Sequence, residues 1–363
     1  MMNEKEQRVL ELLRQNPFLS QQEMAQQLNM SRPAVANILS ACMKDGKLLG
    51  RAYVFPEAKH IVCIGGANVD RKIHIRGALH MATSNPATSE ETVGGVARNI
   101  AENLGRLGES VRLITVAGDD AAWAMIEEQS KPYMNVAAVE KLSTHQTGTY
   151  TAVLNEAGDL VLAAADMDIY DMLTEALVQK HEQLFIHAKY IVADLNCPKE
   201  TIAYLQQVAT VHRIPLIAVP VSSPKMANLP DDFTGITWLM CNRDEAESLV
   251  GYSLYEDAQF EQALQHIQQR GVENVVITNG SEKVWLRAAS GDVLTKDIEA
   301  VEQVVDVTGA GDAFVAAFIY GILAEQTLDE TLQLAMTNAR ETIQSTHTVR
   351  KNITKNQLHT EAN

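Results

Sequence analysis

The 363-residue sequence is poor in cysteine and contains no long apolar run. Its four cysteines lie far apart, and neither a CxxC pair nor a His/Cys cluster has the ligand spacing of a zinc site. No stretch approaches the roughly 18 apolar residues that a membrane span requires. The N-terminal residues carry charges of both signs and no apolar segment of the kind found in a secretory signal. These absences predict a cytoplasmic protein with reduced, buried cysteines and no membrane partner.

Two common nucleotide-binding signatures are also missing. The sequence has no GxxxxGK[ST] segment, which excludes a P-loop enzyme. A dinucleotide-binding fingerprint needs three spaced glycines after the first strand, and Gly65-Gly66 does not supply them. A nucleotide site in this chain would have to be built from other motifs.

Positive charge is scarce outside the N-terminal segment. Residues 1–58 hold seven Lys/Arg and six Asp/Glu, whereas the remaining residues hold 23 and 40. An acidic surface repels the phosphates of nucleic acid. Only the N-terminal segment is therefore a candidate for binding DNA.

The N-terminal segment has the pattern of three short helices and a hairpin. Apolar residues at helical spacing predict a helix over Glu4–Gln15. The capping box Ser20-Gln-Gln-Glu23 should start a second helix that runs to about Leu28, and Ser31 can cap a third. Two short strands are expected over Leu48–Phe55.

Residues 1–57 thereby resemble a winged helix-turn-helix domain. In that resemblance Ser31, Arg32 and Asn37 face the DNA groove, and Arg51 on the wing contacts phosphate. The alternative is a three-helix module that mediates only dimerisation or docking. We expect DNA binding and a homodimeric protein.

Residues 58–363 alternate between buried strands and amphipathic helices, which predicts a parallel sheet covered by helices on both faces. The expected strands are His60–Ile64, Val111–Val116, Tyr190–Ala193, Leu216–Val219, Trp238–Cys241 and Val275–Thr278. The expected helices are Ala97–Leu107, Lys199–Val211, Ala258–Arg270, Ala313–Leu323 and Leu328–Gln344. Strands at about 70–93 and 147–166 should form a small lid over the C-terminal edge of the sheet, where such folds bind ligands. The last 18 residues are polar, and we expect them to be mobile.

The strongest chemical motif is Asp306-Val-Thr-Gly-Ala-Gly-Asp312, which is followed by an apolar helical run. The amides of Gly309, Ala310 and Gly311 at a helix N-terminus would form an anion hole. Asp312 could accept the proton of an attacking hydroxyl while these amides hold a transferring phosphoryl group. The alternatives are a helix N-cap for Asp312 and a tight turn for the glycines.

Two earlier glycine motifs point to a ligand rich in hydroxyl groups. Gly94-Gly95-Val-Ala-Arg98-Asn99 allows a ligand to lie on the backbone, and Asn99 offers a donor and an acceptor. Gly65-Gly-Ala-Asn68-Val-Asp70 ends the first strand, and its Asn and Asp can bind vicinal hydroxyls. A glycine-rich helix entry, a buried polar Asn99 and ordinary turn chemistry remain as alternatives.

These three segments, in this order and at this spacing, resemble the ribokinase-like (PfkB-type) family of sugar and nucleoside kinases. The resemblance covers roughly residues 60–350. It implies that Asp312 is the catalytic base and that Gly309–Gly311 form the anion hole. It also implies a substrate site formed by Asn68, Asp70, Gly94, Gly95 and Asn99.

The same resemblance implies ATP and Mg²⁺ as cofactors. Asn242-Arg-Asp-Glu245 resembles the Asn-x-x-Glu motif of the family, which places Glu245 near Mg²⁺ and phosphate. Thr278-Asn-Gly280-Ser281 resembles the family's Thr-x-Gly contact with ATP. Asn338 is a candidate for the adenine pocket by position only, and the alternative is a polar residue on a helix surface.

A K⁺ site is the point at which the sequence departs from the family. In the family Asp306 and the Thr308 carbonyl would join a later loop to bind K⁺. That loop reads Ser345-Thr-His-Thr-Val349 here instead of a glycine-rich turn. The resemblance therefore implies K⁺ activation through Asp306 and Thr308 but not through this later loop.

Within the family the likeness is strongest to the pseudouridine kinase branch. Ser84-Asn-Pro86 and the following glycine motif resemble that branch, as does Ala165-Asp166-Met-Asp168 in the lid region. The branch would explain Arg98, which sugar kinases usually lack, as a substrate contact. Asp166 and Asp168 could read the edge of the base.

The resulting prediction is ATP-dependent phosphorylation of a hydroxyl, the 5′-OH, of a nucleoside or pentose, with pseudouridine preferred. One alternative is a kinase for another sugar or nucleoside. Another is a transcriptional regulator that uses the kinase fold as a ligand sensor. Retention of Asp312 and the full glycine loop favours the enzyme, because a sensor needs neither.

Overall fold

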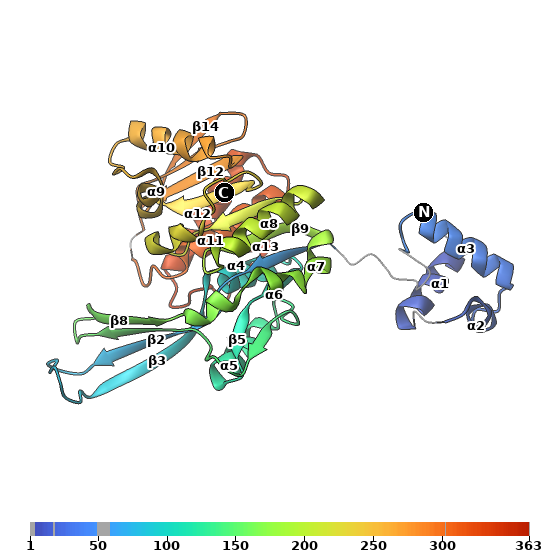
Figure 1. The fold of residues 1–363 in the computed structure, drawn as a ribbon, viewed down its shortest axis with the longest axis horizontal. Helices are drawn as coiled ribbons and strands as arrows, with labels where there is room; N and C mark the ends of the chain where they lie inside the picture. The colour runs from blue at the N-terminus through green and yellow to red at the C-terminus, as the bar shows by residue number, and fades with distance from the viewer. Residues whose placement is uncertain (1–3, 17–18, 49–58, 302, 363) are drawn as a thin grey trace. The chain divides into compact units, whose positions relative to one another are not determined.

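The computed structural model describes residues 4–16, 19–48, 59–301 and 303–362 of the chain. The chain divides into two compact units, Met1–Ala58 and Lys59–Asn363, and each has an apolar core of its own (Figure 1). Among the described residues, no helix combines the length and apolar character needed to cross a bilayer.

The N-terminal unit contains three helices, α1 (Glu4–Gln15), α2 (Gln21–Gln27) and α3 (Arg32–Lys44). Ser20 and Glu23 form the predicted capping box of α2. Ser31 caps α3, because its Oγ accepts a hydrogen bond from the Ala34 amide. Buried apolar side chains from all three helices form one core. Of the predicted hairpin, positions 49–55 lie outside the described residues.

A mixed eight-stranded sheet forms the centre of the C-terminal unit, in the order β14-β13-β12-β11-β10-β9-β1-β4. Its parallel strands are β1 (His60–Ile64), β4 (Val111–Ile114), β9 (Ala188–Asp194), β10 (Leu216–Val219), β11 (Trp238–Asn242) and β12 (Asn274–Asn279). All of these were predicted. Two further strands, β13 (Lys283–Arg287) and β14 (Val293–Asp297), extend the sheet in antiparallel fashion and were not predicted.

Helices cover both faces of this sheet, as the sequence predicts. One face carries α4 (Val96–Arg106), α5 (Ala121–Ser130), α11 (Ala310–Leu323), α12 (Leu328–Ile343) and α13 (Lys355–Ala362). The other carries α6 (Glu175–Gln179), α7 (Glu182–Ile186), α8 (Lys199–His212), α9 (Arg243–Val250) and α10 (Asp257–Gln269). Each face of the sheet has its own apolar core, which we call the first core on the α11 face and the second core on the α8 face. Successive strand residues point to opposite faces, so Cys63 lies in the first core and Ile64 in the second.

Two expectations about the edges of this unit are wrong. The predicted strand Val111–Val116 breaks after β4, and β5 (Val116–Gly118) pairs instead with β6 (Glu140–Leu142) in a separate small sheet. The last 18 residues were expected to be mobile, but they include α13. Leu358 of α13 is fully buried against the first core, which fixes this helix to the body.

A four-stranded lid projects from the body of the C-terminal unit (Figure 1). Its strands are β2 (Asn68–Ile75), β3 (Ala87–Gly94), β7 (Thr149–Leu154) and β8 (Leu160–Asp166), in the order β3-β2-β7-β8. Strand β2 follows directly after β1 and Gly65–Ala67, and β3 leads directly into α4. The lid therefore begins and ends at the carboxyl edge of the large sheet, where the predicted site residues lie.

Candidate active site

Two cavities adjoin the N-terminal turn of α11, and they share one acidic residue. The larger cavity, about 660 Å³, has among its lining residues Asn68, Asp70, Gly95, Asn99, Gly309 and Asp312. The smaller cavity, about 170 Å³, has among its lining residues Asn242, Glu245, Thr278, Gly311 and Asp312. Asp312 thus forms part of the wall of both.

Helix α11 begins at Gly309, where the backbone conformation and the close neighbouring atoms require a glycine. Gly309 is the N-cap, with a φ of 82°, and a Cβ on it would lie 2.2 Å from the Thr348 carbonyl oxygen. Gly309 lines the larger cavity and Gly311 the smaller one. The Ala310 amide donates a 3.3 Å hydrogen bond to the Val307 carbonyl oxygen. The first turn of α11 therefore presents a helix N-terminus to both cavities, which suits an anion between them.

Asp312 has the environment of a proton acceptor that works near neutral pH. Its Oδ2 accepts a 2.8 Å hydrogen bond from Asn99 Nδ2. Burial raises the pKa of Asp312 to about 7; the hydrogen bond from Asn99 lowers it, and the charges of Asp194 and Asp70 raise it further. The alternative of a helix N-cap is wrong, because Gly309 holds that position.

Arg98 lies behind Asn99, in the interior of the unit. Its side chain is almost fully buried, forms an ion pair with Glu102 and donates to Ser130 Oγ over 3.2 Å. It also donates to Asn99 Oδ1 over 3.1 Å, which leaves the Asn99 amide nitrogen directed at Asp312. Arg98 was predicted to contact substrate, but the structure gives it these protein partners instead.

Asn68 and Asp70 form the adjoining part of the larger cavity, at the start of β2. Asn68 Nδ2 donates a 2.6 Å hydrogen bond to Asp70 Oδ1, and burial raises the pKa of Asp70 to about 6. A Cβ at Gly94 would lie 2.2 Å from Asp70 Oδ2, so the first glycine of the pair leaves room for this carboxylate. A neighbouring carboxylate and amide can together bind two vicinal hydroxyl groups.

Asp194, at the end of β9, holds the glycine motifs in place and was missed by the sequence analysis. It is fully buried, and its Oδ2 accepts from the amides of Gly66 and Ala97 at 2.8 and 2.9 Å. Its Oδ1 accepts from the amide of Asn196 at 2.9 Å. Burial raises the pKa of Asp194. The available signal was an acidic residue at the carboxyl end of an apolar strand.

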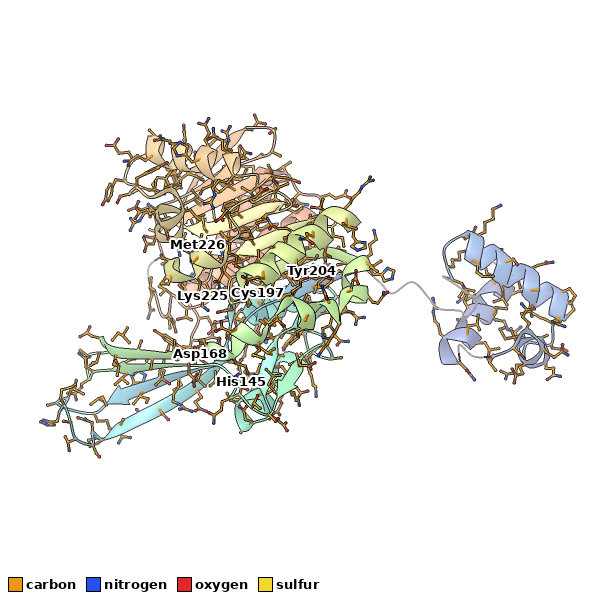
Figure 2. All side chains as sticks on the ribbon, in the orientation of Figure 1. His145, Asp168, Cys197, Tyr204, Lys225 and Met226 are labelled. Atoms are coloured by element: carbon orange, nitrogen blue, oxygen red, sulfur yellow. The ribbon has the colours of Figure 1, made fainter. Side chains whose placement is uncertain are left out.

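The lining of the larger cavity also includes charged groups of both signs. Asp168 and Asp171 come from the short helix η1 (Asp168–Met172), and Lys225 comes from η2 (Ser223–Asn228). Figure 2 shows Asp168 where the lid meets the body of the unit. The sequence analysis singled out Asp168 but not Asp171 or Lys225.

Asp166, predicted to contact the base, belongs to the other face of the lid. Strand residues alternate between faces, and Ala165 lines the larger cavity opposite Tyr150. Asp166 therefore points away from that cavity and is exposed. The structure brings Asp168 to the cavity in its place.

The smaller cavity contains part of the predicted ATP site. Asn242 and Glu245 form a capping box on α9: the Asn242 amide donates to Glu245 Oε2, and the Glu245 amide to Asn242 Oδ1, both over 2.9 Å. Burial raises the pKa of Glu245. Thr278 at the end of β12 also lines this cavity. Gly280 and Ser281 lie on the exposed turn between β12 and β13, beyond the cavity wall.

Asn338 has a structural environment in this unit. It is fully buried on α12, so the alternative of a helix-surface position is wrong. Its amide nitrogen donates to the Ala313 carbonyl oxygen over 2.9 Å and to Asn103 Oδ1 over 3.2 Å. Its oxygen accepts from Arg350 Nε over 2.9 Å. These bonds join α12 to α4, α11 and the C-terminal segment, and the structure does not bring Asn338 to either cavity.

Asp306 and Thr308, the predicted K⁺ residues, form a closed turn before α11. Asp306 Oδ1 accepts from the Thr308 amide at 3.0 Å and from Thr308 Oγ1 at 2.7 Å. Asp306 Oδ2 lies 2.5 Å from Lys72 Nζ on the lid strand β2.

The residues predicted to contact DNA can be compared by their exposure in the N-terminal unit. Arg32 and Asn37 are exposed on α3, and Ser31, which caps this helix, is exposed as well. Lys47, a further cation of this unit, pairs with Glu6 over 2.5 Å. Arg51 lies outside the described residues.

Family models match both units of the chain. The model described as pfkB family carbohydrate kinase matches residues 58–355, and the model described as winged helix-turn-helix DNA-binding matches residues 2–48.

Three curated relatives are about equally similar. An uncharacterized sugar kinase of Escherichia coli, YeiI, is 31% identical over 340 residues, covering 92% of each chain. The pseudouridine kinase of the same organism is 31% identical over 264 residues, covering 72% of this chain and 82% of its own. The guanosine-inosine kinase of Exiguobacterium acetylicum is 30% identical over 291 residues, covering 79% of this chain and 95% of its own.

Solved structures share the fold of the C-terminal unit. A carbohydrate kinase from Agrobacterium tumefaciens superposes with a TM-score of 0.75 at 28% identity, covering 84% of this chain and 97% of its own. Arabidopsis thaliana ribokinase, solved with ribose and ATP, superposes with a TM-score of 0.75 at 20% identity, covering 84% of this chain and 99% of its own.

Proposed function

Because the chain belongs to the pfkB family of carbohydrate kinases, whose members here include nucleoside kinases, we propose that it transfers the γ-phosphoryl group of ATP to the 5′-OH of pseudouridine. At the coarser level, the chain is a sugar or nucleoside kinase with a ribokinase-like fold. The proposal concerns the acceptor, the roles of the residues and the ion requirements.

The observation that carries the proposal is the position of Asp312 in the walls of both cavities. An acceptor in the larger cavity could place its hydroxyl at the Asp312 carboxylate, which would accept the proton as the oxygen attacks phosphorus. The phosphoryl group would pass across the N-terminus of α11, where helix amides stabilise its negative charge. Asn99 would keep the carboxylate oriented. Positioning and electrostatics of this kind supply most of the catalysis in phosphoryl transfer.

The smaller cavity suits the phosphate end of ATP and its metal. Its volume of about 170 Å³ is below the usual range for a whole drug-sized ligand, so we expect the adenosine part to lie on the adjoining surface. Glu245 and Asp312 are the carboxylates in its wall. Mg²⁺ commonly uses one or two carboxylates together with water and ATP phosphates, so Glu245 fits a role beside the metal. Bound Mg²⁺ would neutralise phosphate charge during transfer.

The charged groups that line the larger cavity support a nucleoside as acceptor. Its lining includes Asn68, Asp70 and Asn99, which could bind hydroxyl groups. It also includes the charged side chains of Asp168, Asp171 and Lys225. Pseudouridine has a ring N–H where uridine has its glycosidic bond, and a carboxylate there can accept from it. Lys225 can donate to a ring carbonyl. The 31% identity to a pseudouridine kinase supports the same acceptor.

A turnover screen tests the acceptor. ATP consumption is measured with pseudouridine, uridine, inosine, guanosine and ribose, and the phosphorylated product is identified by mass spectrometry. A site built around one hydrogen bond can reject the analogue that lacks it by about 10⁴-fold in kcat/KM. We expect pseudouridine to exceed uridine by a large factor. Equal rates for the two would contradict the acceptor assignment, and turnover of inosine or guanosine alone would favour a purine nucleoside kinase.

A second function, DNA binding, is favoured by the match of residues 2–48 to winged helix-turn-helix domains. The exposed Ser31, Arg32 and Asn37 would read the major groove from α3. A selection from random duplexes should recover an enriched sequence, and Arg32→Ala should weaken binding to it. Recovery of no enriched sequence by the full chain would instead support a docking module.

A further inference from the structure

Strand β2 of the lid carries a cationic side chain on each of its two faces. Asp70 and Lys72 are two residues apart, so they share the face that borders the larger cavity. Arg71 lies between them on the opposite face, where its guanidinium pairs with Glu91 on β3 over 2.6 Å. The strand therefore directs one cation toward the catalytic side and one away from it.

The cation on the catalytic side reaches the turn that precedes α11. Lys72 Nζ lies 2.5 Å from Asp306 Oδ2, although the two residues are 234 positions apart in the sequence. The other oxygen of Asp306 accepts both the amide and the hydroxyl of Thr308. Burial alone would raise the pKa of Asp306, but the hydrogen bonds from Lys72 and Thr308 hold it below its ordinary value. Asp306 is thus an ionised carboxylate whose two oxygens are both engaged.

This arrangement does not fit the K⁺ site implied by the family resemblance. The carboxylate that would face K⁺ already faces an ammonium group. The loop that would supply further ligands packs closely on the same turn, since a Cβ at Gly309 would lie 2.2 Å from the Thr348 carbonyl oxygen. An ammonium group and K⁺ both neutralise one carboxylate charge, so either could stabilise this turn.

We propose that Lys72 is a positioning residue that supplies the cation at Asp306, so that the enzyme works without a monovalent metal ion. The ion pair holds the Asp306–Thr308 turn, and this turn leads directly into the glycines at the start of α11. Because Lys72 belongs to the lid, the pair also ties the position of the lid to the shape of the anion hole. Phosphate binding at α11 would then depend on Lys72, a residue of the same lid strand that carries Asp70 in the wall of the larger cavity.

The first test is the response of the wild-type enzyme to K⁺. The rate is measured in tetramethylammonium salt with and without K⁺ at constant ionic strength, using whichever of pseudouridine, inosine and ribose the enzyme phosphorylates fastest. A wrong acceptor assignment therefore leaves the test intact. We expect the same kcat and the same KM for ATP in both salts. Activation by about tenfold or more on adding K⁺ would overturn the proposal.

The second test replaces the cation. Lys72→Met removes the charge, Lys72→Arg keeps it, and Arg71→Met removes the neighbouring charge on the opposite face as a matched control. Loss of a hydrogen bond to a charged group corresponds to about 10- to 100-fold, which we expect in kcat/KM for ATP with Lys72→Met. Lys72→Arg and Arg71→Met should stay near wild type, and KM for the acceptor should change little.

Two further results separate positioning from loss of folding. Affinity for a non-hydrolysable ATP analogue, measured by calorimetry, should fall in Lys72→Met at an unchanged unfolding temperature. Asp306→Asn should show a similar defect, and the double variant Lys72→Met/Asp306→Asn should be no worse than the single ones. Equal ATP kinetics for Lys72→Met and Lys72→Arg would overturn the proposal, and so would additive effects in the double variant.

Discussion

Asp312 shares its surroundings with two other acidic side chains, Asp70 and Asp194. Their charges add to the effect of burial on the pKa of Asp312, while the Asn99 hydrogen bond and the charge of Arg98 act in the opposite direction. The balance leaves a carboxyl group that changes its charge near pH 7. Arg98 matters here through Asn99, whose amide it orients.

The pH dependence of the reaction follows from this balance. Below a pKa of about 7 Asp312 holds a proton and cannot accept one from the acceptor hydroxyl. We expect kcat/KM for the acceptor to rise roughly tenfold per pH unit below pH 7 and to level off above it. A pH–rate profile checks this, with the pH stability of the fold measured in parallel. A profile flat down to pH 5 would show that Asp312 is not the group that limits the rate.

Asp312→Asn tests the base directly. Asparagine keeps the shape and can still accept from Asn99, but it cannot take a proton. We expect kcat to fall by about 10²- to 10⁴-fold. A folded variant with turnover near that of wild type would refute the role of Asp312 as base.

The same variant carries a prediction for stability. The pKa of Asp312 is about 7 in the folded state and about 4 in the unfolded chain. Its contribution to the free energy of unfolding is therefore present below pH 4 and is lost as pH rises through about 7. Asp312→Asn should therefore unfold at a higher temperature than wild type at pH 8, and the difference should shrink toward pH 5. Thermal unfolding at the two pH values measures this. A constant difference would mean that the charge of Asp312 is not costly to bury.

Residues within one motif were more predictable than residues that act across motifs. Asn68, Asp70 and Asp312 stand in short segments whose spacing carries the chemistry, and the structure brings them to one cavity. Asp194 stands at the end of an apolar strand, but its bond to the Gly66 amide, 128 residues away, cannot be read from a local pattern. Arg98 was assigned to the substrate from the likeness to one branch of the family. Its partner Glu102 is four residues further along the same helix, but the sequence does not show that both side chains are buried.

At the scale of elements, the lid strand β8 combines an edge position with apolar exposure. It is the last strand in the lid sheet, and Leu160 and Leu162 are 57% and 61% exposed. Exposed edge strands pair readily with another chain, and exposed apolar side chains mark interaction surfaces. This edge is therefore our candidate for the interface of the predicted homodimer.

Leu162→Asp should weaken that dimer, because it places a charge on the exposed edge. Light scattering at several protein concentrations measures the dimer fraction. Val211→Asp on α8, where Val211 is 74% exposed, is the matched control and should leave the fraction unchanged. A wild-type protein that is monomeric throughout would contradict the predicted homodimer.

Elements with a continuous apolar pattern were predicted, and those without it were missed. The parallel strands are buried on both faces and read as apolar runs. Strand β14 forms the edge of the large sheet and contains a lysine, as edge strands often do. Strand β13 beside it has only three apolar residues between Lys283 and Arg287. Helix α13 has one buried residue, Leu358, and one buried residue gives no periodic signal.

At the scale of the whole molecule, the two units have separate cores. A chain that begins at Lys59 keeps the large sheet, the lid and both cavities. We expect it to retain kcat/KM within about twofold of the full chain, because such units fold independently. A loss of tenfold or more, in a protein with a normal unfolding transition, would show that residues 1–58 take part in catalysis.

The shared wall at Asp312 has a consequence for inhibition. A bisubstrate analogue, in which a phosphate chain joins the acceptor to adenosine, would pass from one cavity to the other along the N-terminus of α11. Its acceptor half would lie in the larger cavity of about 660 Å³, whereas the smaller cavity offers about 170 Å³ to the phosphates. Selectivity among related kinases should therefore reside in the acceptor half of such a compound, and changes to its adenine half should alter affinity with little effect on selectivity.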